Sequence, residues 1–197
     1  MKTKSISRIK ESITEVEYRK LMNAVRGNEN IRANTKSNML RTFCILYRTG
    51  LRLNELQDLR VSNIKELVEM GTTIATLSKT SSQRKLFITD DFKRELNKLF
   101  NFKLEDDENR VITKGSNKNK RTGINDIVFI GMVNKIIQSI LGKTYSSHDF
   151  RRGIIMEMGS KSINPKIIAS FISHKSVRTT LNYMNPTDND VMNCLIR

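Results

Sequence analysis

The spacing of apolar residues limits the possible folds more than any other feature of this sequence. Over most of the chain they recur every three to four positions, which is typical of helices that bury one face. Thr14 and Glu17 form a capping-box pattern, and Gly27, Gly50 and Gly159 act as stop signals. The pattern predicts helices over residues 14–27, 35–47, 51–59, 89–100, 125–141, 147–158, 165–172, 176–184 and, at the end of the chain, 187–196.

The helical pattern is interrupted between residues 63 and 89. Three short runs of β type, 64–68, 73–77 and 85–88, are separated by Gly71 and by a polar turn over 79–82. They predict a small antiparallel sheet. A polar, basic segment over 103–123 reads as a long loop and is the expected place for a hinge. The expected fold class is therefore mainly α with a small antiparallel β-sheet (α+β), without internal repeats.

Charge narrows the choice of partner. The 197 residues include 35 Lys and Arg against 20 Asp and Glu, a net charge of +15, which favours a polyanion such as nucleic acid. A basic protein without such a partner is the alternative. No apolar run is long enough for a membrane span and the N-terminus is not a signal peptide, so we expect a cytoplasmic protein. Cys44 and Cys194 form neither a disulfide framework nor a metal-ligand spacing with the histidines.

Arg151 occupies an unusual place on the helix predicted over 147–158. At 100° per residue it projects into the middle of an apolar arc that includes Phe150 and Ile155. A charge in that position needs either a buried ion pair or an anion in a cleft. His148 is on the flank of the same face and either shares such a ligand or serves only as a cap or surface group.

Tyr183 also departs from the pattern of its helix. Val177, Leu181 and Met184 form the apolar stripe, and Tyr183 projects well away from the centre of that stripe. This is not the position of a simple core tyrosine. A partly buried tyrosine that hydrogen-bonds a neighbour through its hydroxyl is the structural alternative.

Four short motifs together resemble those of the tyrosine recombinases, also called the phage integrase family. They are Thr-Gly-Leu-Arg-Leu-Asn-Glu-Leu at 49–56, His-Asp-Phe-Arg at 148–151, Ile-Ser-His at 172–174 and Thr-Thr-Leu-Asn-Tyr at 179–183. Each motif alone would be a weak signal, whereas four in order are a strong one. The resemblance covers about residues 14–183 and implies the catalytic-domain fold of that family.

The spacing of these motifs supports the resemblance. Arg151 and His174 are 23 positions apart, and Tyr183 follows His174 by 9, as is typical of the family. Two positions depart from it. Ser173 stands where the family usually has glycine, and Arg152 stands where histidine is common. Neither change removes a catalytic group.

The resemblance implies a role for each motif residue. Arg52 and Arg151 would clamp the scissile phosphate, because guanidinium groups match its oxygens in shape and charge. Tyr183 would be the nucleophile. His148 would act as general base or proton relay, and His174 would hydrogen-bond the phosphate. The reaction would need no metal and no cofactor, since a 3′-phosphotyrosyl bond conserves the energy of the broken strand.

In this family a lysine on a β-hairpin turn protonates the departing 5′-oxygen. Lys79 is our choice for this residue, whereas Lys85 and Arg84 are expected to be phosphate-positioning or exposed strand charges. Glu55, one helical turn after Arg52, is expected to orient that arginine or to be buried with it, and not to act chemically. The basic residues near the motifs and in the loop are expected to contact double-stranded DNA: Arg84, Lys85, Lys118, Lys120, Arg121, Arg152 and Lys175.

The chain is expected to form a single catalytic domain over residues 1–197. Because the first motif comes early, we expect no separate N-terminal core-binding domain, whether this is an excised catalytic domain or a naturally short member. Residues 185–197 read as a C-terminal tail helix with an apolar side, which would pack either in cis or on a neighbouring subunit. The family implies a homo-oligomer, dimer or tetramer, on DNA and a nucleoid-associated location.

Two other functions are compatible with these residues. A type IB topoisomerase uses a closely similar set of groups but relaxes supercoils without joining different partners. A catalytically silent DNA-binding regulator with the same fold would keep its effect after Tyr183→Phe. The recombinase interpretation predicts the opposite, namely loss of activity with DNA binding retained.

Overall fold

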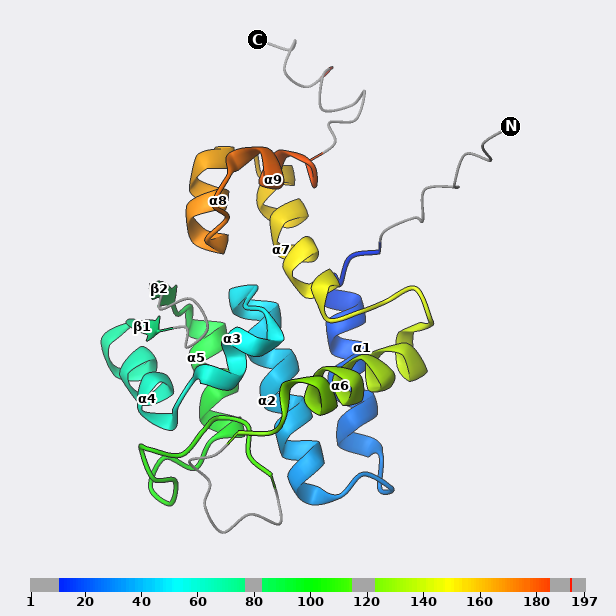
Figure 1. The fold of residues 1–197 in the computed structure, drawn as a ribbon, viewed down its shortest axis with the longest axis vertical. Helices are drawn as coiled ribbons and strands as arrows, with labels where there is room; N and C mark the ends of the chain where they lie inside the picture. The colour runs from blue at the N-terminus through cyan, green and yellow to red at the C-terminus, as the bar shows by residue number, and fades with distance from the viewer. Residues whose placement is uncertain (1–10, 77–82, 115–122, 185–191, 193–197) are drawn as a thin grey trace.

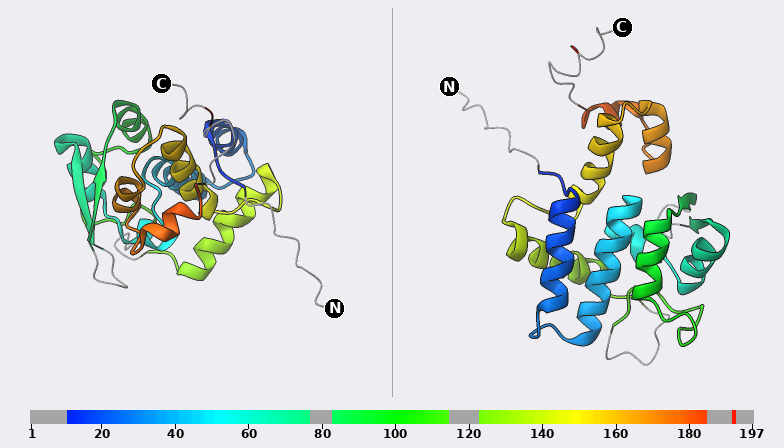
Figure 2. Two further views of the ribbon diagram at one scale, coloured as in Figure 1. Left: turned by 90° about the horizontal axis from the view of Figure 1, so that it is seen from above. Right: turned by 180° about the vertical axis from the view of Figure 1, so that it is seen from behind.

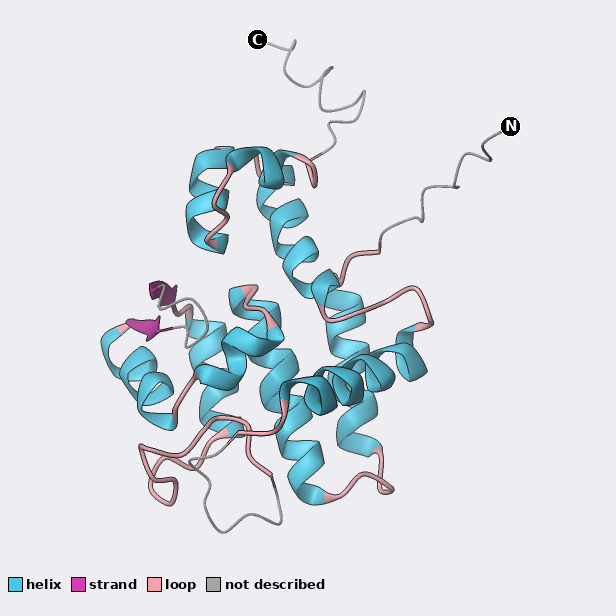
Figure 3. Cartoon of the chain, viewed as in Figure 1, coloured by secondary structure: helices cyan, strands magenta, loops and turns pink. Residues whose placement is uncertain are grey.

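Helices make up most of the computed structural model, which describes residues 11–76, 83–114, 123–184 and 192 (Figure 3). Within these residues there are nine helices and one two-stranded sheet (Figure 1). In chain order the elements are α1 (Glu15–Gly27), α2 (Ala33–Thr49), α3 (Leu53–Asp58), α4 (Val61–Met70), β1 (Thr72–Thr76), β2 (Gln83–Phe87), α5 (Asp90–Leu99), α6 (Asp126–Leu141), α7 (His148–Ser160), α8 (Pro165–Ile172) and α9 (Val177–Leu181). The expected class, mainly α with a small antiparallel sheet, is confirmed.

Helix α2 is at the centre of the main core. It packs against α1, α5 and α7, and it buries residues on several sides, including the consecutive residues Phe43, Cys44, Ile45 and Leu46. A helix that is apolar on several sides needs neighbours on each of them. The Phe43 ring is 5.7 Å from the ring of Phe150, so the core of α2 continues directly into the start of α7.

The end of α2 sets the position of the following turn. Gly50 has φ of 61°, in the left-handed region, and its N–H donates to the Leu46 carbonyl, so Gly50 closes the helix as predicted. A Cβ at this position would be 2.9 Å from Cδ1 of Ile172. Glycine therefore lets the end of α8 lie directly on the turn between α2 and α3. Seen from above, α8 and α9 lie over this turn (Figure 2).

The sheet is a single antiparallel hairpin. Its register pairs Thr73 with Leu86 and Ala75 with Arg84. Side chains alternate between the two faces of a strand, and in β2 Arg84 and Leu86 are buried while Lys85 is exposed. The alternation thus turns an arginine toward the interior of the protein.

The strand predicted over 64–68 is wrong, because these residues belong to helix α4. Val61, Ile64 and Leu67 are buried at helical spacing, and the Asn63 side chain accepts the backbone N–H of Arg60 at the start of the helix. Gly71 ends the helix with φ of 81°. The β-branched residues of this short run suggested a strand, but the buried face and the cap specify a helix.

A second, smaller apolar cluster joins α7, α8 and the residues that follow α9 in the upper part of Figure 1. Its buried members are Ile155, Ile168 and Ile172, with Tyr183 and Met184 packed against them. Gly159 does not close α7 as predicted, since the helix runs through Ser160. A Cβ at Gly159 would be 3.2 Å from Cε of Met184, so this glycine provides room for the chain after α9.

The segment before α1 is attached to α7. The Ile13 N–H donates to the Asp149 carbonyl at 3.0 Å, and Arg152 donates to the Glu11 carbonyl at 3.3 Å. A Cβ on Gly153 would be only 2.2 Å from the Ile13 carbonyl oxygen. The two segments therefore approach as closely as glycine allows.

Across the described residues, no helix combines the length and apolar character needed to cross a membrane. The tail helix predicted over 187–196 and the turn over 79–82 lie outside the described residues, apart from Met192.

Candidate active site

A small pocket of about 100 Å³ opens between α3, α6 and α7. It brings together Arg52, His148 and Arg151, which sequence analysis had assigned to one site. Its lining residues are Leu51, Arg52, Leu53, Asn54, Ile130, Asn134, Ser147, His148 and Arg151. Segments almost 100 positions apart thus share one cavity, and its lining includes two arginines and no carboxylate.

Arg151 is held by main-chain carbonyls. It is 6% exposed, and it donates to the Gly50 carbonyl at 2.8 Å and to the Ile172 carbonyl at 2.6 Å. Its Nε donates to Nε2 of His174 at 3.3 Å. Within the described part of the chain its hydrogen bonds go to these three groups and not to a carboxylate. Burial, with Arg52 and Arg84 nearby, lowers the pKa of Arg151 to about 9, which leaves the group charged at neutral pH.

Arg52 is at the start of α3 and is the more accessible of the two clamp arginines, with 43% of its side chain exposed. Its Nη1 donates to Oε1 of Glu55 at 2.7 Å, and its backbone N–H donates to Oε2 at 2.9 Å. Burial alone would raise the pKa of Glu55, but these hydrogen bonds and the charge of Arg84 outweigh it and lower the pKa. Glu55 is therefore a charged carboxylate that orients Arg52, as expected.

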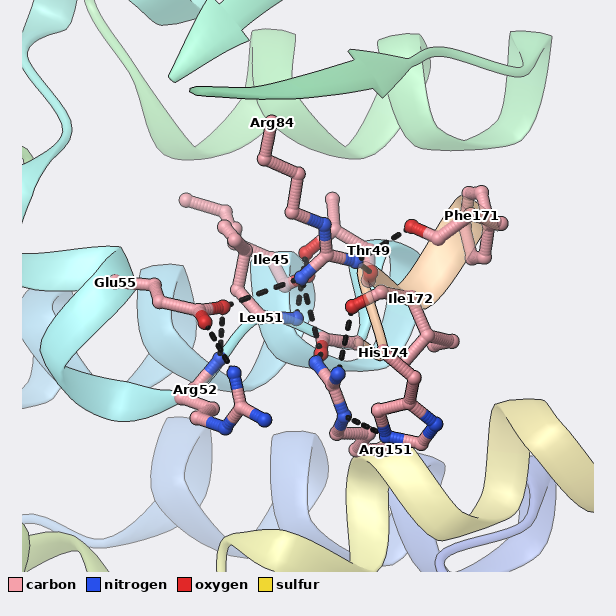
Figure 4. A network of polar contacts seen from close by, with 11 residues as sticks. Ile45, Thr49, Leu51, Arg52, Glu55, Arg84, Arg151, Phe171, Ile172 and His174 are labelled. Atoms are coloured by element: carbon pink, nitrogen blue, oxygen red, sulfur yellow. Dashed lines mark hydrogen bonds and ion pairs between the residues drawn. The ribbon is translucent and has the colours of Figure 1, made fainter. Parts of the chain in front are cut away.

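Arg84 differs from the expectation of an exposed residue that contacts DNA. Its side chain is 1% exposed, because strand alternation directs it inward toward Glu55 and a group of carbonyls. It donates to Oε2 of Glu55 at 3.2 Å, to the Gly50 carbonyl at 3.4 Å, to the Phe171 carbonyl at 3.1 Å and to the Thr49 carbonyl. Figure 4 shows Arg84 extending from β2 toward Arg151. Burial lowers its pKa.

His174 follows α8 and contacts Arg151. Because a guanidinium can only donate, Nε2 of His174 accepts from Arg151, which places the ring hydrogen on Nδ1. Nδ1 then donates to Oγ1 of Thr180 at 2.8 Å. Burial and the charges of Arg151, Arg52 and Arg84 lower the pKa of His174 to about 4, so the ring is neutral at pH 7.

Tyr183 lies directly after α9 and is half-buried. Its ring is stacked on that of His174, with centroids 6.2 Å apart and 22° between the planes. The guanidinium of Arg152 is 5.2 Å from the centre of the Tyr183 ring. The predicted nucleophile is therefore next to the predicted phosphate-binding histidine, and Arg152 touches the tyrosine.

The other predicted site residues are at the surface or outside the description. His148 is exposed at the pocket, and Lys85 and Lys175 are exposed. Four predicted residues lie outside the described residues: Lys79, Lys118, Lys120 and Arg121. In the segments that the structure describes, no group of three or more His, Cys, Asp or Glu residues could hold a metal ion.

Sequence analysis did not single out two polar residues of the site. Asn134 lines the pocket and accepts the Ser147 N–H at 2.8 Å, which fixes the start of α7. Thr180 is fully buried and binds His174. An amide in the strongly apolar α6 was an available signal for Asn134. Thr180 belongs to the motif at 179–183, but no role was assigned to it there.

Comparison with known families gives one match over most of the chain. The phage integrase family matches residues 11–190. No curated protein matches the sequence.

Solved structures share the fold at low sequence identity. XerA recombinase aligns with a TM-score of 0.71 and 18% identity over 98% of this chain and 65% of its own. Tn1549 transposon integrase in complex with transposon right end DNA gives 0.72 and 15%, over 97% and 66%. A lambda integrase dimer bound to a core site gives 0.61 and 19%, over 92% and 61%. The chain thus spans slightly less than two thirds of the length of these structures.

Proposed function

Because the chain belongs to the phage integrase family, we propose that it is a site-specific recombinase that cleaves and rejoins DNA through a phosphotyrosine bond to Tyr183. One observation carries the proposal. Arg52 and Arg151 meet at one pocket, and Tyr183 is stacked on the histidine that Arg151 binds. This grouping has the parts that phosphoryl transfer requires, namely cations for the phosphate oxygens and a nucleophile close by.

In the proposed cleavage step, Oη of Tyr183 attacks the phosphorus of one DNA strand. The new bond joins Oη to phosphorus, and the bond between phosphorus and the 5′-oxygen breaks. His148 takes the phenolic proton, and Lys79 supplies a proton to the 5′-oxygen as it leaves. Arg52 and Arg151 balance the charge that develops on the non-bridging oxygens.

The proposed rejoining step reverses this chemistry on a second strand. A 5′-hydroxyl attacks the phosphotyrosyl phosphorus, loses its proton to Lys79, and displaces Oη of Tyr183, which regains a proton from His148. One phosphate ester is exchanged for another in each step. No net bond energy is lost, which is why a covalent intermediate suits strand exchange better than hydrolysis does.

His174 would change its hydrogen bonding when a phosphate enters. In the free protein its Nε2 accepts from Arg151, so it has no hydrogen there to offer. The phosphodiester monoanion beside the ring favours the protonated form and draws the Arg151 donor toward its own oxygens. We propose that His174 becomes a donor to the phosphate at that point.

Double-stranded DNA is the proposed partner. The net charge of +15 supports electrostatic binding to the backbone. Integrase and recombinase structures of the same fold include complexes with DNA, one of them a dimer. We propose that this protein also acts as a dimer or tetramer on DNA, in the cytoplasm with the nucleoid, and that residues 1–197 form one catalytic domain.

The test is formation of a protein-linked DNA strand. Nicked duplexes carrying candidate repeats from beside the gene are incubated with the protein in chelator, and a denaturing gel separates covalent complexes. Wild type is expected to give a shifted band and Tyr183→Phe none. A wild-type protein that binds these duplexes without forming the band contradicts the proposal and favours a silent regulator. Rapid relaxation of plasmids without site preference favours a topoisomerase.

A further inference from the structure

Arg84 lies between the two arginines of the proposed phosphate clamp without lining their pocket. We infer that Arg84 is a positioning residue, which fixes Arg52 through Glu55 and Arg151 through the Gly50 carbonyl. The inference rests on the proposed recombinase function and deepens it. It also replaces the expectation that Arg84 binds DNA directly.

The burial of Arg84 is the first step of the argument. Its side chain is 1% exposed, and a guanidinium removed from water costs free energy unless its charge and its donors are satisfied. The carboxylate near it, Glu55, also serves Arg52. The Nε of Arg84 has no hydrogen-bond partner among the described residues. Arg84 thus shares its carboxylate with Arg52 and otherwise depends on main-chain carbonyls, which connects its position to that of Arg52.

Two shared acceptors connect Arg84 to the clamp. Glu55 accepts from Arg52 through Oε1 and from Arg84 through Oε2, at 2.7 and 3.2 Å. The Gly50 carbonyl accepts from Arg84 at 3.4 Å and from Arg151 at 2.8 Å. A single shared hydrogen-bond acceptor thus connects Arg84 to each clamp arginine (Figure 4). Without it, Glu55 could turn fully toward Arg52 and the Gly50 turn would lose a restraint.

Arg84 and Arg151 also grip the end of α8 together. Arg84 donates to the Phe171 carbonyl and Arg151 donates to the next carbonyl, that of Ile172. His174 follows Ile172 by two residues, so both arginines help to position the backbone that carries the His174 ring. Arg84 also lies on β2, which starts at Gln83, four positions after Lys79 in the sequence. One side chain therefore connects the hairpin to both halves of the clamp.

Charge gives Arg84 a second effect on the site. Glu55 pairs with Arg52 and Arg84, while Arg151 has no carboxylate partner among the described residues, so positive charge accumulates at this cluster before any phosphate binds. A fixed buried cation of this kind stabilises a developing negative charge without having to reorganise. Because it does not reach the surface, it should affect the chemical step more than DNA affinity.

The experiment compares Arg84→Met and Arg84→Lys with the control Arg41→Met. Arg41 is also a largely buried arginine in an ion pair, with Glu105, but its partners Leu99 and Val111 line no part of the pocket. Single-turnover cleavage of the nicked duplex is measured at saturating protein, and DNA affinity is measured separately. Arg84→Met is expected to cut the cleavage rate by about 100-fold, since displacement of clamp groups by roughly 1 Å has effects of this size.

The variants separate positioning from other roles. The DNA affinity of Arg84→Met should change by less than about 3-fold. Arg84→Lys keeps the positive charge but lacks the planar guanidinium group, and it should recover part of the cleavage rate. The double variant Arg84→Met with Glu55→Gln should also recover part of the cleavage rate, because the neutral amide pairs less strongly with Arg52 than the carboxylate does. Arg41→Met should unfold more easily yet cleave at the wild-type rate per folded molecule.

Nuclear magnetic resonance supplies a readout that does not require cleavage. The Nε–H of Arg151, bonded to His174, should give a protected signal in wild type and in Arg41→Met, and lose protection in Arg84→Met and partly in Arg84→Lys. Retained protection, a wild-type cleavage rate, or an equal loss of affinity and rate in Arg84→Met would overturn the inference. If wild type forms no covalent complex while the signal behaves as expected, the proposed function fails and the positioning of Arg151 by Arg84 stands.

Discussion

Arg151 donates a hydrogen bond from its Nε to Nε2 of His174 at 3.3 Å, across 23 positions of sequence. This contact joins the first turns of α7 to the residues after α8, and it fixes both the direction of the guanidinium and the tautomer of the ring. The histidine is consequently neutral, with Nδ1 donating to Thr180.

His174 should titrate far below the usual range in the free protein. Its pKa is lowered to about 4 by burial and nearby arginines, from an ordinary value of 6.5. The unfolded chain therefore binds a proton below pH 6.5 that the folded chain refuses, so the free energy of unfolding falls as pH falls from 6.5 toward 4. Histidine ring signals followed by nuclear magnetic resonance give the pKa directly. A nicked DNA ligand should raise it, and a midpoint near 6.5 without DNA would contradict the structure.

Tyr183→Phe should abolish the covalent complex and leave DNA affinity unchanged, because it removes only the nucleophilic oxygen. The stacking of the ring on His174 and the contact with Arg152 persist in phenylalanine. Denaturing gels and binding titrations are the two measurements. Tyr47→Phe on α2, whose ring stacks on Tyr18, is the matched control and should keep full activity. A covalent band from Tyr183→Phe would mean that another residue is the nucleophile.

Ser173→Gly should stabilise the protein by roughly 0.5–1 kcal/mol. Ser173 caps the end of α8 with φ of 59°, a conformation that costs free energy for any residue with a Cβ. This explains why glycine is usual at this position in the family. Urea unfolding measures the change. Ser170→Gly, at an exposed position inside α8, is the control and should destabilise. Equal loss from both changes would refute the strain at Ser173.

Gly153→Ala should destabilise the protein by about 1–3 kcal/mol, the usual cost of overpacking. The new methyl group would be 2.2 Å from the Ile13 carbonyl oxygen, so the segment before α1 must move and its hydrogen bond to Asp149 is strained. Thermal unfolding and proteolysis near residue 13 report the change. Gly131→Ala on α6 meets nothing within 4 Å and should stabilise by about 0.5–1 kcal/mol. The idea fails if both alanine variants behave alike.

Local signals predicted most of the helices. The capping box at Thr14 and the glycine at Gly50 act over a few residues, and the structure has both where they were expected. Residues 64–68 were predicted wrongly because a short apolar run fits either period, and only its burial against the rest of the fold decides between them. Gly159 likewise resembled a helix stop, but it serves the packing of Met184.

The sequence predicted which residues belong to the site better than it predicted the hydrogen bonds that hold them. Arg52, His148 and Arg151 came from motifs that resemble one family, and they do share a pocket. Arg84 could be placed on a strand but not on its inner face, since an arginine gives no apolar signal for burial. Its carbonyl partners carry no signal in the sequence at all, because every residue has the same main chain.

Because every residue supplies the same carbonyl group, a site held by main-chain acceptors can be retained while the sequence around it changes. Arg84 and Arg151 are held largely by the carbonyl oxygens of Thr49, Gly50, Phe171 and Ile172. A mutation exchanges a side chain and leaves the carbonyl in place, so neighbouring positions can drift as long as the backbone keeps its course. Proteins that share under a fifth of their residues with this chain could thus inherit the same grip on the two arginines.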